Sequence, residues 1–188
     1  GRLSSIQEEA ARSLLVEDLC ILVAPPGIGK TVIGCHLIAA RKRNTLVIVH
    51  RQQLLAQWIV QLSHFLGLER NEIGQIGGGK KNRNGKLDVA MLQSLVHRGR
   101  VDEVVKEYGY IMVDECHHCP AFSFERVLSE AKARYFTGFT ATPQRRDGQQ
   151  PIIEMQLGPA RFVVSARTQN QMEPFRRPFY NRTAVIDD

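Results

Sequence analysis

The sequence lacks an apolar stretch long enough to cross a membrane: its longest continuous apolar candidate, residues 19–24, has the length of a strand. Its first ten residues lack the apolar core of a signal peptide. Its four cysteines do not suggest a disulfide framework, and it lacks internal repeats. We therefore expect a protein of the reducing cytoplasm with no membrane partner, and we set aside small disulfide-stapled domains.

Acidic residues are outnumbered, because 25 Lys and Arg against 19 Asp and Glu give a net charge of +6. The basic side chains gather in three stretches, at residues 41–51, 80–86 and 145–146. This balance suits a polyanionic partner such as nucleic acid, although a solvated basic surface explains it equally well. A hydrophobic content of 43% over 188 residues favours one globular domain with a core of its own.

Short apolar runs alternate with helical patterns along most of the chain. The predicted strands are residues 19–24, 45–50, 87–92, 110–115 and 134–142, and the predicted helices are residues 4–16, 31–40, 51–67, 101–107 and 122–133. Residues 77–85 are predicted as a loop from their Gly, Lys and Asn content. This alternation is typical of an α/β protein whose mostly parallel sheet carries helices on both faces.

A phosphate-binding loop is predicted between the first predicted strand and the helix that begins near Thr31. The loop N–H groups and the helix N-terminus favour an anion there. Lys30 would reach the β- and γ-phosphates of a nucleoside triphosphate such as ATP, and the Thr31 hydroxyl would hold Mg²⁺. The pattern opens with Ala where most such loops have Gly. Its loop residues are Ala24, Pro25, Pro26, Gly27, Ile28 and Gly29.

The apolar run "YIMVDE" ends in two carboxylates, Asp114 and Glu115. One carboxylate at a strand end suffices for a Mg²⁺ ion that keeps several waters, and Asp114 fits that role. Glu115 beside it would accept a proton from the attacking water or orient that water. Because ligands bind at the carboxyl ends of parallel strands, we expect these side chains and the phosphate loop to meet at one edge of the sheet.

The run "CHHCP" at residues 116–120 offers four side chains that bind zinc elsewhere. Consecutive ligands cannot all close on one tetrahedral ion, and the sequence has no second ligand pair at zinc-site spacing. We therefore expect no zinc.

Taken together, "APPGIGKT", "DECH" and "TAT" resemble motifs I, II and III of superfamily 2 helicases and translocases, in order and in spacing. The stretch "LVIVHRQQLLAQW" resembles motif Ia. The stretch "ARYFTGFTATPQRRDG" resembles sequences of the XPB-type and type III restriction-type branch of this superfamily. The resemblance covers nearly all of residues 5–165. It implies a RecA-like P-loop NTPase domain and a nucleic-acid-dependent ATPase.

The resemblance also implies roles for individual residues. Gln7 stands at the adenine-reading position. The residues implied to couple the nucleotide to domain movement are His117, Thr140, Ala141 and Thr142. Contacts to the nucleic-acid backbone, with DNA favoured over RNA, fall to His50, Arg51, Gly78, Gly79, Lys80, Gln93 and Ser94.

Motors of this family have two RecA-like domains, and the second carries motifs IV to VI with the arginine finger. No match to motifs IV to VI is found here, and Arg145–Arg146 follow motif III too closely to serve as the finger. Residues 1–165 are therefore predicted as the first motor domain, and residues 166–188 as a terminal segment toward the second. We expect the chain alone to hydrolyse ATP poorly.

Three other interpretations remain open from the sequence. The first is a nucleotide-gated switch module that binds nucleic acid without moving along it. The second is the motor part of a restriction or defence complex. The third is a metabolic kinase, which would leave the DECH box and the basic loop without a purpose.

Overall fold

A computed structural model describes residues 3–25, 27–116 and 126–141, and the backbone of residues 121–125, 160–165 and 182–187. Its centre is a nine-stranded sheet with the order β11-β10-β1-β9-β8-β2-β5-β3-β4. Every pairing in that sheet is parallel except β3 with β4. The main strands are β1 (Leu19–Val23), β2 (Thr45–Val49), β5 (Leu87–Met91), β8 (Tyr110–Val113) and β9 (Tyr135–Thr140).

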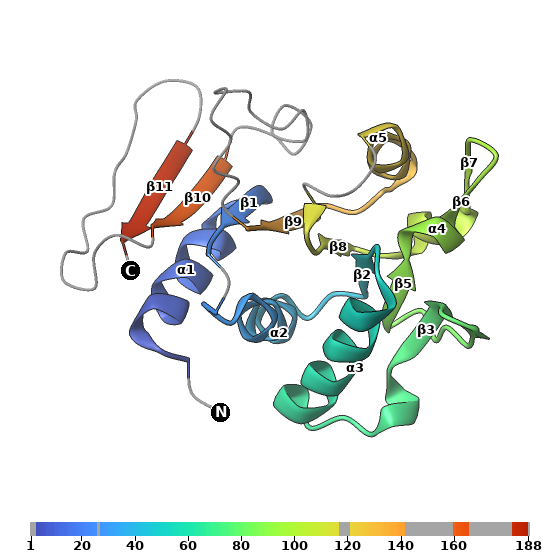
Figure 1. The fold of residues 1–188 in the computed structure, drawn as a ribbon, viewed down its shortest axis with the longest axis horizontal. Helices are drawn as coiled ribbons and strands as arrows, with labels where there is room; N and C mark the ends of the chain where they lie inside the picture. Colours follow the sequence, from blue (N-terminus) through green and yellow to red (C-terminus); the bar gives the residue numbers. More distant parts are fainter. Residues whose placement is uncertain (1–2, 26, 117–120, 142–159, 166–181, 188) are drawn as a thin grey trace.

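Helices cover both faces of this sheet (Figure 1). On one face lie α1 (Ser5–Val16), α2 (Lys30–Arg41) and α3 (Gln52–Leu66). The other face carries α4 (Leu92–Leu95), the 3-10 helix η2 (Glu103–Glu107) and α5 (Ala121–Glu130). The predicted α/β class with a mostly parallel sheet is confirmed.

Alternation along the strands explains why two apolar layers form. In β1, Cys20 and Leu22 belong to the core beneath α1, α2 and α3, whereas Ile21 and Val23 belong to the core beneath α5 and η2. Successive side chains of a strand point to opposite faces, so a strand buried on both faces is apolar throughout. This burial is why five short hydrophobic runs could be recognised as strands.

Sequence reasoning missed the short elements at one end of the sheet. Within the predicted loop 77–85, β4 (Lys80–Lys81) pairs antiparallel with β3 (Gly74–Gly77), so the loop prediction was wrong there. Strands of two to four residues leave no periodic pattern to read. The predicted helix 101–107 is shorter and of 3-10 type, as η2. The other missed elements in this part of the chain are η1 (Arg70–Glu72), α4, β6 (Val96–His97) and β7 (Arg100–Val101).

Two strands follow the motif-bearing part of the chain. β10 (Ala160–Ser165) pairs with β1, and β11 (Arg182–Asp187) pairs with β10 at the sheet edge. β11 lies inside the segment that we predicted as terminal, and the division at residue 165 stays a prediction. Within the described part of the chain, no helix has the length and apolar character needed to cross a membrane.

Candidate nucleotide and nucleic-acid site

The predicted site residues lie at one edge of the sheet, where its parallel strands have their carboxyl ends. Five described segments follow strands there: the phosphate loop after β1, His50–Arg51 after β2, Gln93–Ser94 after β5, Asp114–Glu115 after β8 and Ala141 after β9. Pro26, His117 and Thr142 lie outside the described residues. The gathering of polar residues that sequence reasoning predicted is therefore present in the fold.

The phosphate loop runs from buried Ala24 to α2, which begins at Lys30. Gly29 is the N-cap of α2 in the left-handed region, and no side chain caps the helix. The first turn of α2 also contains no acidic residue. An uncapped N-terminus of this kind offers N–H groups and a positive dipole end to an anion. The described residues of the loop therefore fit a bound phosphate group.

Gln7 reaches this loop from α1. Its side-chain N–H donates to the Ile28 carbonyl at 2.8 Å, and its amide oxygen accepts from the N–H of Ser4 at 2.9 Å. A Cβ atom on Gly29 would lie 2.5 Å from Nε2 of Gln7, so this close approach requires glycine. Gln7 thus braces the loop, and one N–H hydrogen and one lone pair of its amide oxygen remain for an adenine base.

Asp114 is the buried carboxylate of the site and is 5% exposed. Its Oδ2 accepts from the Trp58 indole Nε1 at 2.8 Å, and its Oδ1 accepts from the Glu115 N–H at 2.8 Å. Burial raises the pKa of Asp114, while the Trp58 hydrogen bond and the charge of Lys30 act to lower it. Carboxylate and hydroxyl oxygens are ligands that Mg²⁺ accepts, and the buried residues Asp114 and Thr31 could supply them.

Glu115 lies in the left-handed region with φ 46°, which is uncommon for a residue with a side chain. Its carboxylate accepts from Nη2 of Arg51 with both oxygens, at 2.8 and 2.9 Å. His50 Nε2 lies 3.8 Å from the same carboxylate. Arg51 and His50, which the sequence predicts as contacts to nucleic acid, therefore both lie beside the Glu115 carboxylate, which it predicts as the proton acceptor.

The remaining predicted nucleic-acid residues lie near the start of α3. Gln93 donates to the His50 carbonyl at 2.8 Å. A Cβ on Gly78 would lie 2.7 Å from Cδ2 of Leu55, which places this glycine against α3. Ser94 packs beside the neighbouring Gly77. After this contact the chain is exposed through residue 84, and this exposed run includes Gly79, Lys80 and Lys81.

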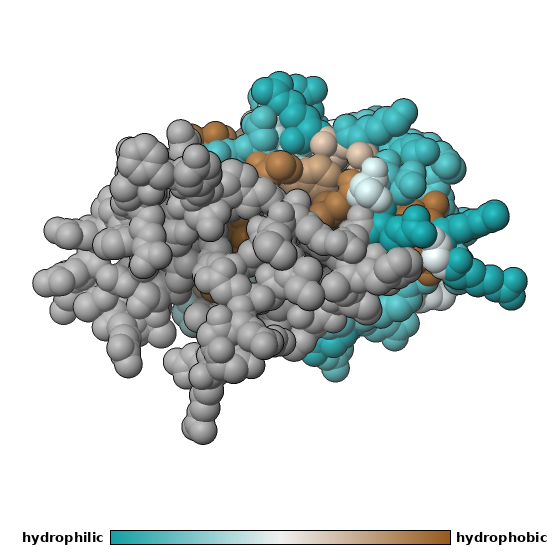
Figure 2. All heavy atoms as spheres, turned by 90° about the horizontal axis from the view of Figure 1, so that it is seen from above, coloured by the Kyte–Doolittle hydropathy of each residue, from teal (hydrophilic) through white to brown (hydrophobic). Residues whose placement is uncertain are grey.

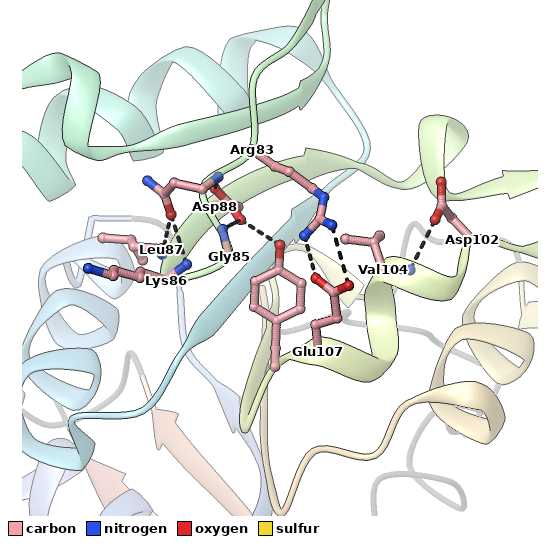
Figure 3. A network of polar contacts seen from close by, with 10 residues as sticks. Arg83, Gly85, Lys86, Leu87, Asp88, Asp102, Val104 and Glu107 are labelled. Atoms are coloured by element: carbon pink, nitrogen blue, oxygen red, sulfur yellow. Dashed lines mark hydrogen bonds and ion pairs between the residues drawn. The ribbon is translucent and has the colours of Figure 1, made fainter.

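The basic loop after β4 is fixed from the protein interior by Asp88, which is fully buried. Asp88 accepts from the N–H groups of Asn84 and Gly85 at 2.8 Å each, and Tyr108 donates its hydroxyl to the same carboxylate. Figure 3 also shows the Arg83 guanidinium paired with Glu107 on η2. In the view of Figure 2, hydrophilic side chains project at the end of the molecule that carries β3 to β7.

Motif III is tied to motif I by the backbone, since the Ala24 N–H donates to the Thr140 carbonyl at 3.0 Å. The Thr140 hydroxyl donates to the Ala141 carbonyl at 3.1 Å. The start of the phosphate loop and the end of β9 are therefore direct neighbours in the sheet.

Sequence reasoning did not include Trp58 in the site. Its place on the apolar stripe of α3 indicated a core residue, and it is fully buried. Only the fold brings its indole N–H to Asp114. The one signal in the sequence was that an indole needs an acceptor when it is buried.

Comparisons with known proteins agree with these features. The model of the family described as type III restriction enzyme, res subunit, matches residues 1–145. The chain is 33% identical to the probable helicase D10 of Escherichia phage T5, over 73% of this chain and 30% of that protein. It is 30% identical to the DNA 3'-5' translocase XPB2 of Sulfurisphaera tokodaii, over 84% of this chain and 34% of that protein.

Among solved structures, the UvsW helicase from bacteriophage T4 superposes with a TM-score of 0.70 at 22% identity, over 84% of this chain and 58% of that chain. This likeness concerns the fold. The chain spans about a third of the length of the T5 and Sulfurisphaera relatives. The motifs, the fold and the family match agree: the chain belongs to the family of the type III restriction enzyme res subunit and has the first RecA-like domain of superfamily 2 helicases.

Proposed function

We propose that this chain is the ATP-binding part of a nucleic-acid-dependent ATPase that moves along or unwinds DNA. The relatives named as a helicase and as a DNA translocase support this proposal. Because the chain spans about a third of those proteins, the activity belongs to a longer protein in which a second RecA-like domain supplies the arginine finger. Residues 1–165 are the proposed domain, and 166–188 lead toward its partner.

In this proposal ATP lies on the phosphate loop, with Lys30 at the β- and γ-phosphates. Thr31 and Asp114 hold Mg²⁺, which neutralises charge on the phosphate oxygens. Glu115 would accept the proton of the attacking water, whose oxygen forms a bond to the γ-phosphorus while the bond from that phosphorus to the β–γ bridging oxygen breaks, so that ADP and inorganic phosphate are released. Gln7 senses the adenine, and His117, Thr140, Ala141 and Thr142 couple the nucleotide to movement.

The observation that carries the dependence on nucleic acid is the ion pair between Arg51 and Glu115. Arg51 is 48% exposed and stands at the N-cap of α3, where a phosphate of the nucleic-acid backbone can reach it. A guanidinium that binds both oxygens of Glu115 competes with the water that this carboxylate must activate. A nucleic-acid phosphate that takes over Arg51 would free Glu115 for hydrolysis.

Polar and basic residues near the start of α3 support a contact to the nucleic-acid backbone that does not read its sequence. Cations, side-chain amides and backbone N–H groups all bind phosphates. Here they are supplied by His50, Gly78, Gly79, Lys80, Gln93 and Ser94. Binding of this kind weakens as salt rises. We also propose a cytoplasmic site of action, which the buried free thiols of Cys20 and Cys35 support.

The test measures ATP hydrolysis by the full-length protein and by this chain, with single- and double-stranded DNA and RNA and with Lys30→Ala as the inactive control. We expect DNA to stimulate the full-length protein and the chain alone to be nearly inert. Stimulation by RNA alone would reverse the choice of nucleic acid. A full-length protein that binds ATP but never hydrolyses it would favour a nucleotide-gated switch.

A further inference from the structure

Trp58, the one tryptophan of the chain, joins α3 to the proposed Mg²⁺ site. The side chain is 0% exposed, and its Nε1 donates to Oδ2 of Asp114 at 2.8 Å. A buried indole N–H needs an acceptor, and Asp114 supplies it. Asp114 is also reached by the charge of Lys30.

The carboxylate of Asp114 has room for a cation after these contacts. Its two oxygens offer about four lone-pair positions. Trp58 occupies one on Oδ2, and the Glu115 N–H occupies one on Oδ1. The two protein donors therefore fix the rotation of the carboxylate and leave one position on each oxygen for Mg²⁺ or its waters.

The indole is itself held in place by close packing. A Cβ atom on Gly34 would lie 2.5 Å from Cη2 and 3.0 Å from Cζ3 of Trp58, so α2 approaches the ring with only a hydrogen between them. On β9, Phe139 packs against Trp58 with ring centroids 6.1 Å apart. Because the ring cannot turn without displacing α2 or β9, the direction of its N–H is set by the packed core.

We propose that Trp58 is a positioning residue of the ATPase site, whose indole N–H holds the Asp114 carboxylate in the orientation that receives Mg²⁺. This inference rests on the proposed function, since it concerns the same Mg²⁺–nucleotide site. Trp58 acts through Asp114 and does not contact the nucleotide.

The first test replaces Trp58 by Phe, which keeps an aromatic ring in the core and removes the N–H. Calorimetry measures the affinity of this chain for ADP with Mg²⁺ and with EDTA. We expect the Mg²⁺-dependent gain in affinity to fall about 10-fold, as for other residues that orient a metal ligand. Affinity in EDTA should stay within about 2-fold of the wild-type value, because packing at the phosphate loop is retained.

Tyr110→Phe is the matched control. Tyr110 is equally buried, and its hydroxyl bonds Thr137 on the neighbouring strand β9. We expect it to lower the unfolding temperature without changing the Mg²⁺-dependent gain. An equal loss in both variants would mean that core damage explains the effect and would overturn the proposal.

The second test is a double-mutant cycle with Asp114→Asn. If Trp58 works through this carboxylate, Trp58→Phe should change the Mg²⁺-dependent gain much less in the Asp114→Asn background. A full additional loss in that background would overturn the proposal.

The third test uses the unchanged chain, so it does not depend on a variant that folds. As the only indole, Trp58 reports on Asp114 by its own fluorescence. Its emission should shift when ADP and Mg²⁺ bind and should not shift with ADP in EDTA.

The binding measurements also separate the failure of this inference from the failure of the proposed function. Equal binding of ADP by the wild-type chain and by Lys30→Ala would overturn the proposed function itself. Normal Mg²⁺-dependent binding by Trp58→Phe would overturn only the role of Trp58.

Discussion

Arg51 and Glu115 are 64 positions apart in the sequence, and both carboxylate oxygens of Glu115 accept from one nitrogen of Arg51. The pair joins the second residue after β2 to the second residue after β8. It is partly exposed, with Glu115 22% and Arg51 48% accessible, so water and salt screen it. A contact of this modest strength can be exchanged for a phosphate when nucleic acid binds.

Arg51→Gln should raise the ATP hydrolysis of the full-length protein in the absence of nucleic acid and reduce the ratio by which DNA stimulates it. The reason is that Glu115 loses the guanidinium that competes with water. Hydrolysis rates with and without DNA measure both effects, and Arg12→Gln makes the same change on the exposed side of α1. A fall in the DNA-free rate would show that Arg51 supports Glu115 instead of restraining it.

Glu115→Gln and Lys30→Ala should separate hydrolysis from binding. Loss of the proton acceptor should reduce the hydrolysis rate of the full-length protein about 10²–10⁴-fold while ATP still binds. Loss of the Lys30 charge should weaken ATP binding itself, because the phosphates lose their cation. Equilibrium binding of ATP alongside steady-state rates distinguishes the two, and equal binding losses in both variants would contradict these roles.

Gly34→Ala should destabilise the chain by about 1–3 kcal/mol, because the added methyl would overlap the fixed ring of Trp58. Denaturant unfolding measures this free energy. Gly109→Ala is the control, since its Cβ would meet only the flexible Arg43 side chain at 3.5 Å. Equal stability of the two variants would mean that the ring of Trp58 can move aside.

Asp88→Asn should destabilise the chain by about 1–3 kcal/mol, because the amide cannot accept from every donor that now meets the carboxylate. It should also weaken DNA binding by the full-length protein, since the basic loop at residues 80–86 loses its anchor. Tyr108→Phe removes one of these donors and should cost less. A fluorescence-anisotropy titration reports the DNA affinity, and an unchanged affinity in Asp88→Asn would remove this loop from the proposed surface.

Cys20 and Cys35 should resist alkylation in the folded chain. Burial raises the pKa of each thiol to about 12, so at pH 8 only about one in ten thousand is the reactive thiolate. Labelling by iodoacetamide, read by mass spectrometry, should rise only as the pH approaches 12 or when denaturant is added. Rapid labelling of either residue at pH 8 without denaturant would show that the core around it opens.

The sequence by itself determined the order of elements and the position of the motifs on them. β1, β2, β5, β8 and β9 were recognised because burial on both faces makes each strand mostly apolar, with Thr45, Asp88 and Thr137 among the buried polar exceptions. The phosphate loop, Asp114 and Glu115 were recognised because each follows such a run with polar residues. These are local patterns, and local patterns can be read without knowing which strands are neighbours. Short β3 and β4, which carry no such pattern, were missed.

Only the tertiary structure decided which side chains meet. β2 lies beside β8 in the sheet, so Arg51 after one strand reaches Glu115 after the other. α3 packs over the same strands, so Trp58 reaches Asp114 from 56 positions away. Strand order depends on how all the helices and strands share two cores, and that long-range packing leaves no trace in the spacing of neighbouring residues.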